Sequence, residues 1–480
     1  MGALRRRSHP VDPIIALITV GGVLFAALVG VAAAEGSAQF GATKLLWVGA
    51  AMVGAMIALS STRAATVVLL LSLAFPFSTQ LISGVSLRTT DLLLLLVLTV
   101  GIARIGLGWA SVPVGLLRWG TLVLAGGAIA GVAGPDIGGS LLREFGGVAL
   151  PLGAAMMVAA TFDRDRDLAR MIQACCVALS GASLAAIAQG LGKLPSGLAP
   201  QLSPDRVNGL FNHPTILATF LIALMLLLIG VCTQGLRTAG TSPLVIVPTI
   251  MLGLVALIET QSRGAVLGLA AGLVVIGGVT VARGRIAPLI ALLAVLAGGL
   301  FVAIPNVPES QRALLVGRFQ KLSQPGAEPG RQRVYAAALK TIEAHPITGV
   351  GVLEFGRIER RRNTVPGLEA GLTHAHSIVL EAWLSLGLVG FVAFYAMAAG
   401  AVRRLWRATR AGAGSTPLTM GWATGSIAAL VGVLVEGSTD MPFWQLEMFT
   451  LVLVLIAIGY RMDPQSPATT RSANASDAAR

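Results

Sequence analysis

Residues 213–232, HPTILATFLIALMLLLIGVC, form an apolar run of 20 residues that contains no Asp, Glu, Lys or Arg. An α-helix of about 20 apolar residues is long enough to cross the hydrocarbon core of a bilayer. Similar runs recur on both sides of this one, and 55% of the chain is hydrophobic while only 12% is charged. Soluble domains carry about 25% charged residues. The sequence therefore predicts a membrane protein with many spanning helices.

The apolar runs predict an all-α fold, a polytopic membrane helix bundle of about 12–14 transmembrane helices. The predicted spans are 13–34, 43–60, 65–82, 91–109, 117–134, 147–161, 168–190, 213–232, 243–260, 264–282, 286–304, 377–400, 418–436 and 442–460. Two of them, 43–60 and 147–161, are short, so twelve spans are an alternative to fourteen.

These spans divide the chain into five regions. Residues 1–190 hold the N-terminal transmembrane helices, 191–304 further helices with arginine clusters on the outer side, 305–376 one large outer loop, 377–462 the C-terminal transmembrane helices, and 463–480 a Ser- and Ala-rich tail expected to be disordered in the cytoplasm.

Arginine is unevenly distributed between the two sides of the predicted bundle. If Arg5, Arg6 and Arg7 lie in the cytoplasm, most other arginines of the short loops fall on the same side, and the short outer loops hold few. This asymmetry follows the positive-inside rule, and an even number of spans returns the C-terminus to the cytoplasm. The net charge of +13 therefore orients the protein in a membrane, and we expect no nucleic-acid partner.

The outer loop 305–376 contains helical patterns of its own. In RQRVYAAALKTIEAHP, residues 331–346, Tyr335, Leu339 and Ile342 repeat at helical spacing and predict one apolar face, and Pro346 ends the helix. The stretch PESQRALLVGRFQKL, residues 308–322, is similar. Structureless loops of this length are uncommon. We therefore predict a small helical cap on the outer membrane surface.

Three clusters of polar residues lie at the outer ends of predicted spans, where ionisable groups are costly. They comprise Arg206, Asn208, Asn212 and His213; Ser262 and Arg263; and Thr373, His374, His376, Ser377 and Glu381. A helix N-terminus attracts anions, and an arginine beside it favours a phosphate or diphosphate. Arg263 follows Ser262, which is a predicted N-cap. The alternative for a single arginine at a span end is a side chain that reaches the lipid headgroups.

His374 and His376 are compatible with two kinds of chemistry. A zinc site needs further ligands, and the sequence shows no third ligand at metal spacing, so we expect no metal. An imidazole that titrates near neutrality can instead act as the general base for an acceptor hydroxyl. A hydrogen-bonded histidine at the interface remains the alternative. Because residues i and i+2 of a helix point apart, we expect one histidine to react and the other to pack, without deciding which.

Three acidic residues lie near the outer edge. Glu381, one turn past His376, is a candidate for a supporting contact. Glu436 and Asp440, in EGSTDMPFW, residues 436–444, either orient His376, bind an acceptor sugar, or lie in a solvated loop. The solvated loop is the favoured interpretation.

Four segments together resemble the O-antigen ligase/polymerase superfamily. They are RVNGLFNHPTILATFL (206–221), ETQSRGAVLGL (259–269), GRQRVYAAALKTIEAHPITGVGVLEFG (330–356) and HAHSIVLEAWLSLGLVG (374–390). By this resemblance, Arg206 and Arg263 are diphosphate-binding arginines and His376 is the essential histidine. Ser377 stands where the family often has Asn. Arg331 matches the arginine that opens the loop helix, and Gly349 and Gly351 match backbone requirements.

The resemblance implies a metal-independent, inverting glycosyltransferase in the bacterial inner membrane, with its active site on the periplasmic side and no cofactor. The donor is a glycan on undecaprenyl diphosphate, and the function expected first is O-antigen ligation to lipid A-core. Polymerisation of lipid-linked repeat units and protein O-glycosylation are alternatives within the superfamily. A small-anion transporter is a more remote one, since it should show inverted repeats and sites at the bilayer midplane. The three cysteines, Cys175, Cys176 and Cys232, lie in predicted spans and show no metal pattern.

Overall fold

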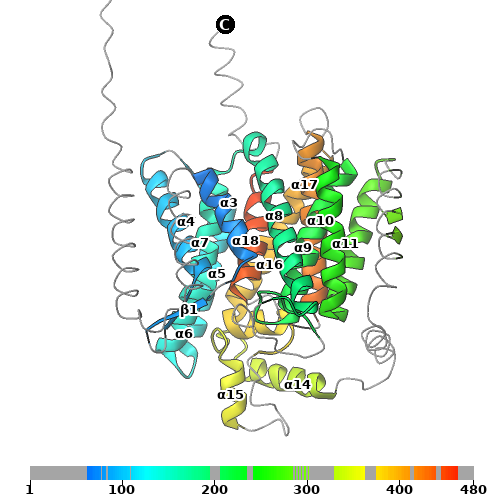
Figure 1. Cartoon of the computed structure of the whole chain (residues 1–480). Coiled ribbons are helices and arrows are strands. Elements are labelled where there is room, and N and C mark those ends of the chain that lie inside the picture. The colour runs from blue at the N-terminus through cyan, green and yellow to red at the C-terminus, as the bar shows by residue number, and fades with distance from the viewer. Residues whose placement is uncertain are drawn as a thin grey trace, which may run out of the picture.

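The computed structural model describes residues 62–76, 78–82, 85–108, 110–194, 206–234, 242–284, 329–362, 374–410, 416–438, 440 and 445–462, with isolated residues between 287 and 301. The helices that run along the bundle are α3 (Thr62–Leu73), α4 (Thr89–Gly106), α5 (Val114–Ala133), α7 (Leu150–Thr161), α8 (Arg164–Gly190), α9 (Pro214–Gln234), α10 (Pro243–Thr260), α11 (Arg263–Val281), α16 (Ile378–Arg410), α17 (Pro417–Gly437) and α18 (Leu446–Gly459). They lie side by side (Figure 1).

Seven helical segments of the described chain are long and apolar enough to cross a membrane. They are Val114–Ala133, Ile137–Thr161, Asp167–Gly190, Pro214–Thr233, Arg263–Val281, Ile378–Arg410 and Pro417–Gly437, and shorter apolar helices occupy Ala64–Leu73, Leu244–Thr260 and Leu446–Gly459. The prediction of a polytopic helical membrane bundle is confirmed. The predicted spans 13–34 and 43–60, and most of 286–304, lie outside the described residues.

Two predicted spans differ from the helices observed. The span 65–82 is wrong in its second half, because α3 ends at Leu73 and β1 (Ser78–Ile82) pairs antiparallel with β2 (Val85–Arg88). Pro76 explains this end, since proline has no N–H to donate and disfavours helical geometry in the residue before it. The short span 147–161 is extended backward by α6 (Ile137–Glu144) and the π-helix η1 (Phe145–Ala149), which lead directly into α7.

The apolar run at residues 213–232 forms most of α9, which lies in the interior of the bundle. Its spanning window on α9 is entirely buried, and α9 packs against α8, α10, α11 and α17. Glycines allow these close approaches, because a Cβ added to Gly268 of α11 would collide with the backbone of Gly432 of α17. The same holds where Gly126 of α5 faces Gly390 of α16. Small residues at such contacts let membrane helices approach closely.

The described part of the outer loop forms two helices, α14 (Pro329–Ala344) and α15 (Phe355–Arg362), at one end of the bundle (Figure 1). We refer to this end as the loop end. The predicted helix before Pro346 is confirmed, but its predicted apolar face is partly wrong. Val334, Ala338 and Ile342 are buried, whereas Leu339 is 50% exposed. The stretch 308–322 lies outside the described residues.

The backbone between α14 and α15 is inserted into a break in α16. Gly387 has φ 63° and ψ 178°, which interrupts the helix. The Val350 N–H donates to the Leu384 carbonyl at 2.7 Å, and the Leu388 N–H donates to the Ile347 carbonyl at 2.9 Å. The loop therefore satisfies backbone groups that the break leaves free, as buried polar groups require.

The expected backbone role of the two loop glycines is confirmed, since Gly349 and Gly351 have φ of 68° and 96°. Residues with a side chain rarely adopt such positive φ angles, whereas glycine adopts them readily. The loop is thus held in one geometry against α16, the helix that follows the two histidines.

Ion pairs hold α15 against the corner between α5 and α6. The Glu354 carboxylate is fully buried and accepts hydrogen bonds from Arg143 and Arg357, the latter at 3.1 Å. Arg357 also contacts Asp136 at 2.6 Å and thereby lowers the pKa of that carboxyl below its usual value. These contacts fix the loop helices relative to the spanning helices.

Candidate functional site

Four segments that are distant in the sequence meet at the loop end. They are residues 206–213 before α9, 260–263 between α10 and α11, 374–377 before α16, and 436–440 at the end of α17. Thr373 lies outside the described residues. All three polar clusters predicted from the sequence are represented among these segments.

Contacts between side chains and backbone join the segments. Arg206 Nε donates to the Thr260 carbonyl at 2.9 Å, which ties the first segment to the second. The Ser262 hydroxyl donates to Glu436 Oε1 at 3.4 Å, which ties the second to the end of α17. The 436–440 segment then reaches the histidine segment through Asp440.

The histidine segment is a tight turn and does not belong to a helix. His376 has φ 49°, an angle that non-glycine residues rarely adopt and that occurs often at functional sites. Glu381 of α16 is buried, and its Oε2 accepts the Ala375 N–H at 2.8 Å. The Tyr335 hydroxyl of α14 donates to the His376 carbonyl at 3.1 Å. The turn is therefore fixed from both the spanning helix and the loop helix.

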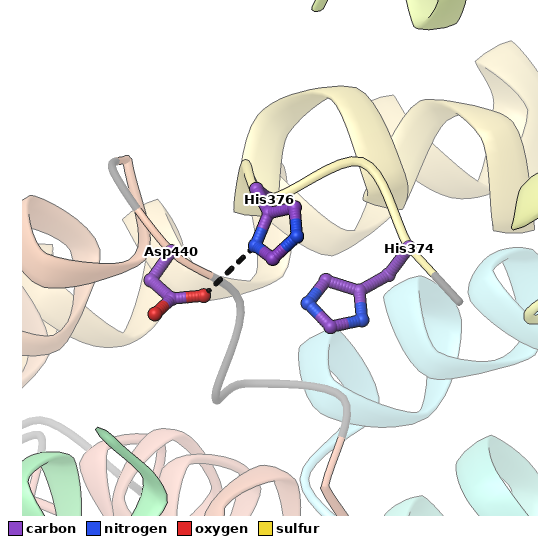
Figure 2. A group of neighbouring side chains, drawn as sticks. All are labelled: His374, His376 and Asp440. Carbon is purple, nitrogen blue, oxygen red and sulfur yellow. Dashed lines mark hydrogen bonds and ion pairs between the residues drawn. The ribbon is translucent and has the colours of Figure 1, made fainter. Parts of the chain in front are cut away.

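His376 is oriented by an acidic partner. Its Nδ1 lies 3.2 Å from Asp440 Oδ1, as Figure 2 shows, and Asp440 Oδ2 lies 3.9 Å from an Arg331 guanidinium nitrogen. An ionised carboxylate only accepts hydrogen bonds, so Nδ1 carries the hydrogen and Nε2 keeps its lone pair. This arrangement suits a general base whose protonated form is stabilised by a neighbouring negative charge.

His374 lies beside His376, with ring centroids 4.4 Å apart (Figure 2). The expectation that the two side chains point apart is wrong, because the segment is a turn and not a helix. Burial, and to a smaller extent the nearby His376, lower the pKa of His374 to about 4, although Asp440 acts to raise it. His374 is therefore neutral at neutral pH.

The segment 206–213 contributes the Arg206 guanidinium and the His213 imidazole to the surroundings of His376. His213 precedes α9, and its Nδ1 accepts the Thr215 N–H at 3.2 Å. Loss of water around the ring lowers the pKa of His213, Asp440 acts to raise it, and Arg206 and His376 act to lower it. His213 therefore lies in the same electrostatic environment as Asp440, Arg206 and His376.

Arg263 is the first residue of α11. The predicted N-cap is confirmed, since the Ser262 hydroxyl accepts the Ala265 N–H at 3.3 Å. The positive end of the α11 dipole and the Arg263 side chain, which is partly buried, therefore lie at the same end of the bundle as His376.

The two asparagines differ in position. Asn208 is 1% exposed, and its backbone and side chain both bond to Gln189 of α8, with N to Oε1 at 2.8 Å. Its contacts are thus those of a residue that holds the 206–213 segment against α8. Asn212 is exposed.

Two of the acidic residues noted in the sequence have partners within the protein, and the contact of Asp440 with His376 agrees with the alternative in which it orients that histidine. Glu436 is fully buried against Ser262, and Asp440 contacts both His376 and Arg331, so the interpretation as a solvated loop is wrong. Asp440 is also the third potential metal ligand beside the two histidines. It is 64 residues away from His376 in the chain, and only the packing of α16 against α17 brings them together.

Comparison with known protein families finds one match within the chain. Residues 248–395 match the family model described as O-antigen ligase. A search of curated proteins finds no match. The matched region contains Arg263, Arg331, His374, His376 and Glu381. This match over residues 248–395 confirms the resemblance of the chain to the O-antigen ligase/polymerase superfamily.

Proposed function

We propose that the protein is a membrane glycosyltransferase that moves a glycan from undecaprenyl diphosphate to an acceptor hydroxyl on the periplasmic face, with lipid A-core as the first expected acceptor. One observation carries the proposal. Two arginines, two helix N-termini and a histidine paired with a carboxylate converge at the loop end, inside and beside the region that matches the O-antigen ligase family.

The donor diphosphate would be held without a metal. Arg206 and Arg263 supply positive charge from two separate segments, and the positive ends of the α9 and α11 helix dipoles lie beside them. Guanidinium groups bind phosphate oxygens in a bidentate manner. They also stabilise the charge that develops on the diphosphate as it leaves, which is the main requirement of this reaction.

His376 would activate the acceptor. Its Nε2 accepts the proton of the acceptor hydroxyl, while Asp440 stabilises the imidazolium that forms. The hydroxyl oxygen then attacks the anomeric carbon from the side opposite the diphosphate. The glycosidic bond to the diphosphate breaks, and the configuration inverts. Helix α14 contacts this turn through the Tyr335 hydroxyl, and it would limit the entry of water, which competes as an acceptor.

The donor lipid would lie against the bundle close to this site. An open groove of about 250 Å³ runs between α16, α17 and α18 and begins at Ile378, two residues after His376. Its lining is almost entirely apolar and includes Phe394, Val402 and Leu430. Such a groove suits part of a polyprenyl chain whose diphosphate is held at the loop end.

The periplasmic placement is supported by the arginine asymmetry of the loops. The positive-inside rule, counted over the short loops and leaving out the long loop 305–376, assigns the arginine-rich side to the cytoplasm. The loop end is then periplasmic, where lipid-linked glycans and their acceptors meet in the bacterial inner membrane.

A transporter is a weaker alternative. Interrupted helices are a feature of transporters, and α16 is interrupted at Gly387. However, the backbone groups at this break are bonded to residues 347–351. The polar cluster lies where α9, α11 and α16 begin and α17 ends, and not halfway along these helices.

Deletion of the coding sequence followed by glycan profiling tests the proposal. Loss of a ligase leaves bare lipid A-core and accumulated lipid-linked polymer. Loss of a polymerase leaves core with a single repeat unit, and loss of a protein glycosyltransferase leaves unmodified glycoproteins. Complementation with wild type should restore the profile, while His376→Ala should not. An unchanged profile for every surface glycan and glycoprotein would rule out the proposal.

A further inference from the structure

Three potential metal ligands are clustered at the turn before α16. One ligand atom from each of His374, His376 and Asp440 lies within 4.8 Å of the other two (Figure 2). All three side chains are partly accessible, so an ion can reach them from solvent. The two histidines come from one short turn, and the carboxylate comes from the end of α17.

The spacing is close to that of a transition-metal site. Zinc bonds to nitrogen and oxygen are about 2.0–2.2 Å, so two ligand atoms of a tetrahedral ion lie roughly 3.4 Å apart. His376 Nδ1 and Asp440 Oδ1 are already 3.2 Å apart. The His374 nitrogen would have to approach by up to about 1.4 Å, which a side-chain rotation supplies.

The ligand types also favour particular ions. Two imidazoles and one carboxylate suit Zn²⁺, Co²⁺ and Ni²⁺, whereas Mg²⁺ and Ca²⁺ prefer oxygen ligands alone. Three protein ligands leave room for water in the remaining coordination position.

We propose that His374, His376 and Asp440 bind a divalent transition metal of the Zn²⁺ type, and that its binding inhibits the protein. The inhibition rests on the proposed function, because an ion bound to His376 Nδ1 and Asp440 Oδ1 would separate this pair and place the imidazole hydrogen on Nε2, the atom proposed to accept the proton of the acceptor. Arg331 limits the affinity, since its guanidinium lies 3.9 Å from Asp440 Oδ2 and repels a bound cation. The ion is therefore a reversible ligand and takes no part in the transfer.

Metal binding can be measured without any activity assay. The full chain, purified in detergent without a histidine tag and stripped with EDTA, is titrated with Co²⁺, whose visible absorption reports its ligands. Zn²⁺ is then used to displace it. We expect one saturable site, with Zn²⁺ affinity at least about tenfold weaker in His374→Ala and in Asp440→Asn. The matched control is His345→Ala, outside the cluster, which should bind like wild type.

A fourth variant separates loss of ligands from loss of fold. Arg331→Ala removes the opposing charge, so it should bind Zn²⁺ several-fold more tightly than wild type, a gain that misfolding does not produce. Absence of the Co²⁺ spectrum in wild type, or wild-type Zn²⁺ affinity in both ligand variants, would overturn the proposed site.

The inhibitory consequence has its own measurement. In a reconstituted transfer assay, Zn²⁺ at a saturating concentration should reduce the rate at least about tenfold, and EDTA should restore it. If the site binds Zn²⁺ but transfer continues at its full rate, the inhibition and the proposed role of His376 are wrong while the site stands. If no donor is transferred at all, the proposed function fails, and the Co²⁺ titration still decides the metal site.

Discussion

The substitution Asp440→Asn removes the charge that faces His376 while it keeps the size of the side chain. At 3.2 Å the attraction between the carboxylate and an imidazolium is about 5 kcal/mol for an effective dielectric constant of roughly 20. The two side chains are 29% and 19% exposed, so solvent screening reduces this to about 3–4 kcal/mol. Since about 1.4 kcal/mol corresponds to a tenfold change in rate, we expect kcat to fall by roughly 10²–10³-fold.

The expected loss concerns kcat more than the donor KM, because Asp440 acts on the protonated histidine that forms during reaction. An asparagine amide can also donate to Nδ1, which would place the hydrogen on Nε2 and remove the base. The assay is glycan transfer by purified protein in lipid vesicles, with kcat and donor KM measured separately. Asp163→Asn, between α7 and α8 at the opposite end of the bundle, controls for the change in charge. A kcat within twofold of wild type for Asp440→Asn would refute the pairing as a functional contact.

Two further substitutions test how the turn and loop are held. Gly387→Ala should destabilise the protein strongly, by several times the roughly 1–2 kcal/mol of a left-handed backbone, because its Cβ would lie 2.5 Å from the Thr348 carbonyl oxygen. Thermal unfolding in detergent should show this loss, and Gly278→Ala, with no atom within 4 Å of the new Cβ, should unfold close to wild type. Glu381→Ala leaves the buried Ala375 N–H without its acceptor, so we expect about 1–3 kcal/mol of lost stability. It should also reduce transfer more than Glu381→Gln, which can still accept; equal stability and activity in the two variants would contradict this role.

The bundle could largely be predicted from the sequence, because a spanning helix is set by local length and apolarity. The runs that became α9, α10, α11 and α17 agree with the observed helices to within two residues at each end. Predictions were less accurate where local signals compete with packing. The segment after Leu73 is apolar enough to continue a helix, yet Pro76 ends it and a hairpin follows.

The candidate site could be predicted only in its parts. Arg206, Arg263 and His376 stand out because charged and titratable groups are rare in so apolar a chain. For Asp440 the sequence favours a solvated loop and leaves a contact with His376 as an alternative, because the two residues are 64 positions apart and only the packing of helices α16 and α17 brings them together. The turn at His376 was also unpredictable, because its left-handed backbone depends on contacts from Glu381 and Tyr335.

The central claim is that cationic side chains from separate helices hold a lipid diphosphate beside a histidine that activates the acceptor. The most direct measurement is transfer by the purified protein in EDTA, from a polyprenyl-diphosphate glycan to its acceptor, with release of the lipid diphosphate. We predict turnover by wild type, and a loss of at least about 10²-fold in both His376→Ala and Arg263→Ala at unchanged membrane insertion. Full activity in both variants would contradict the account.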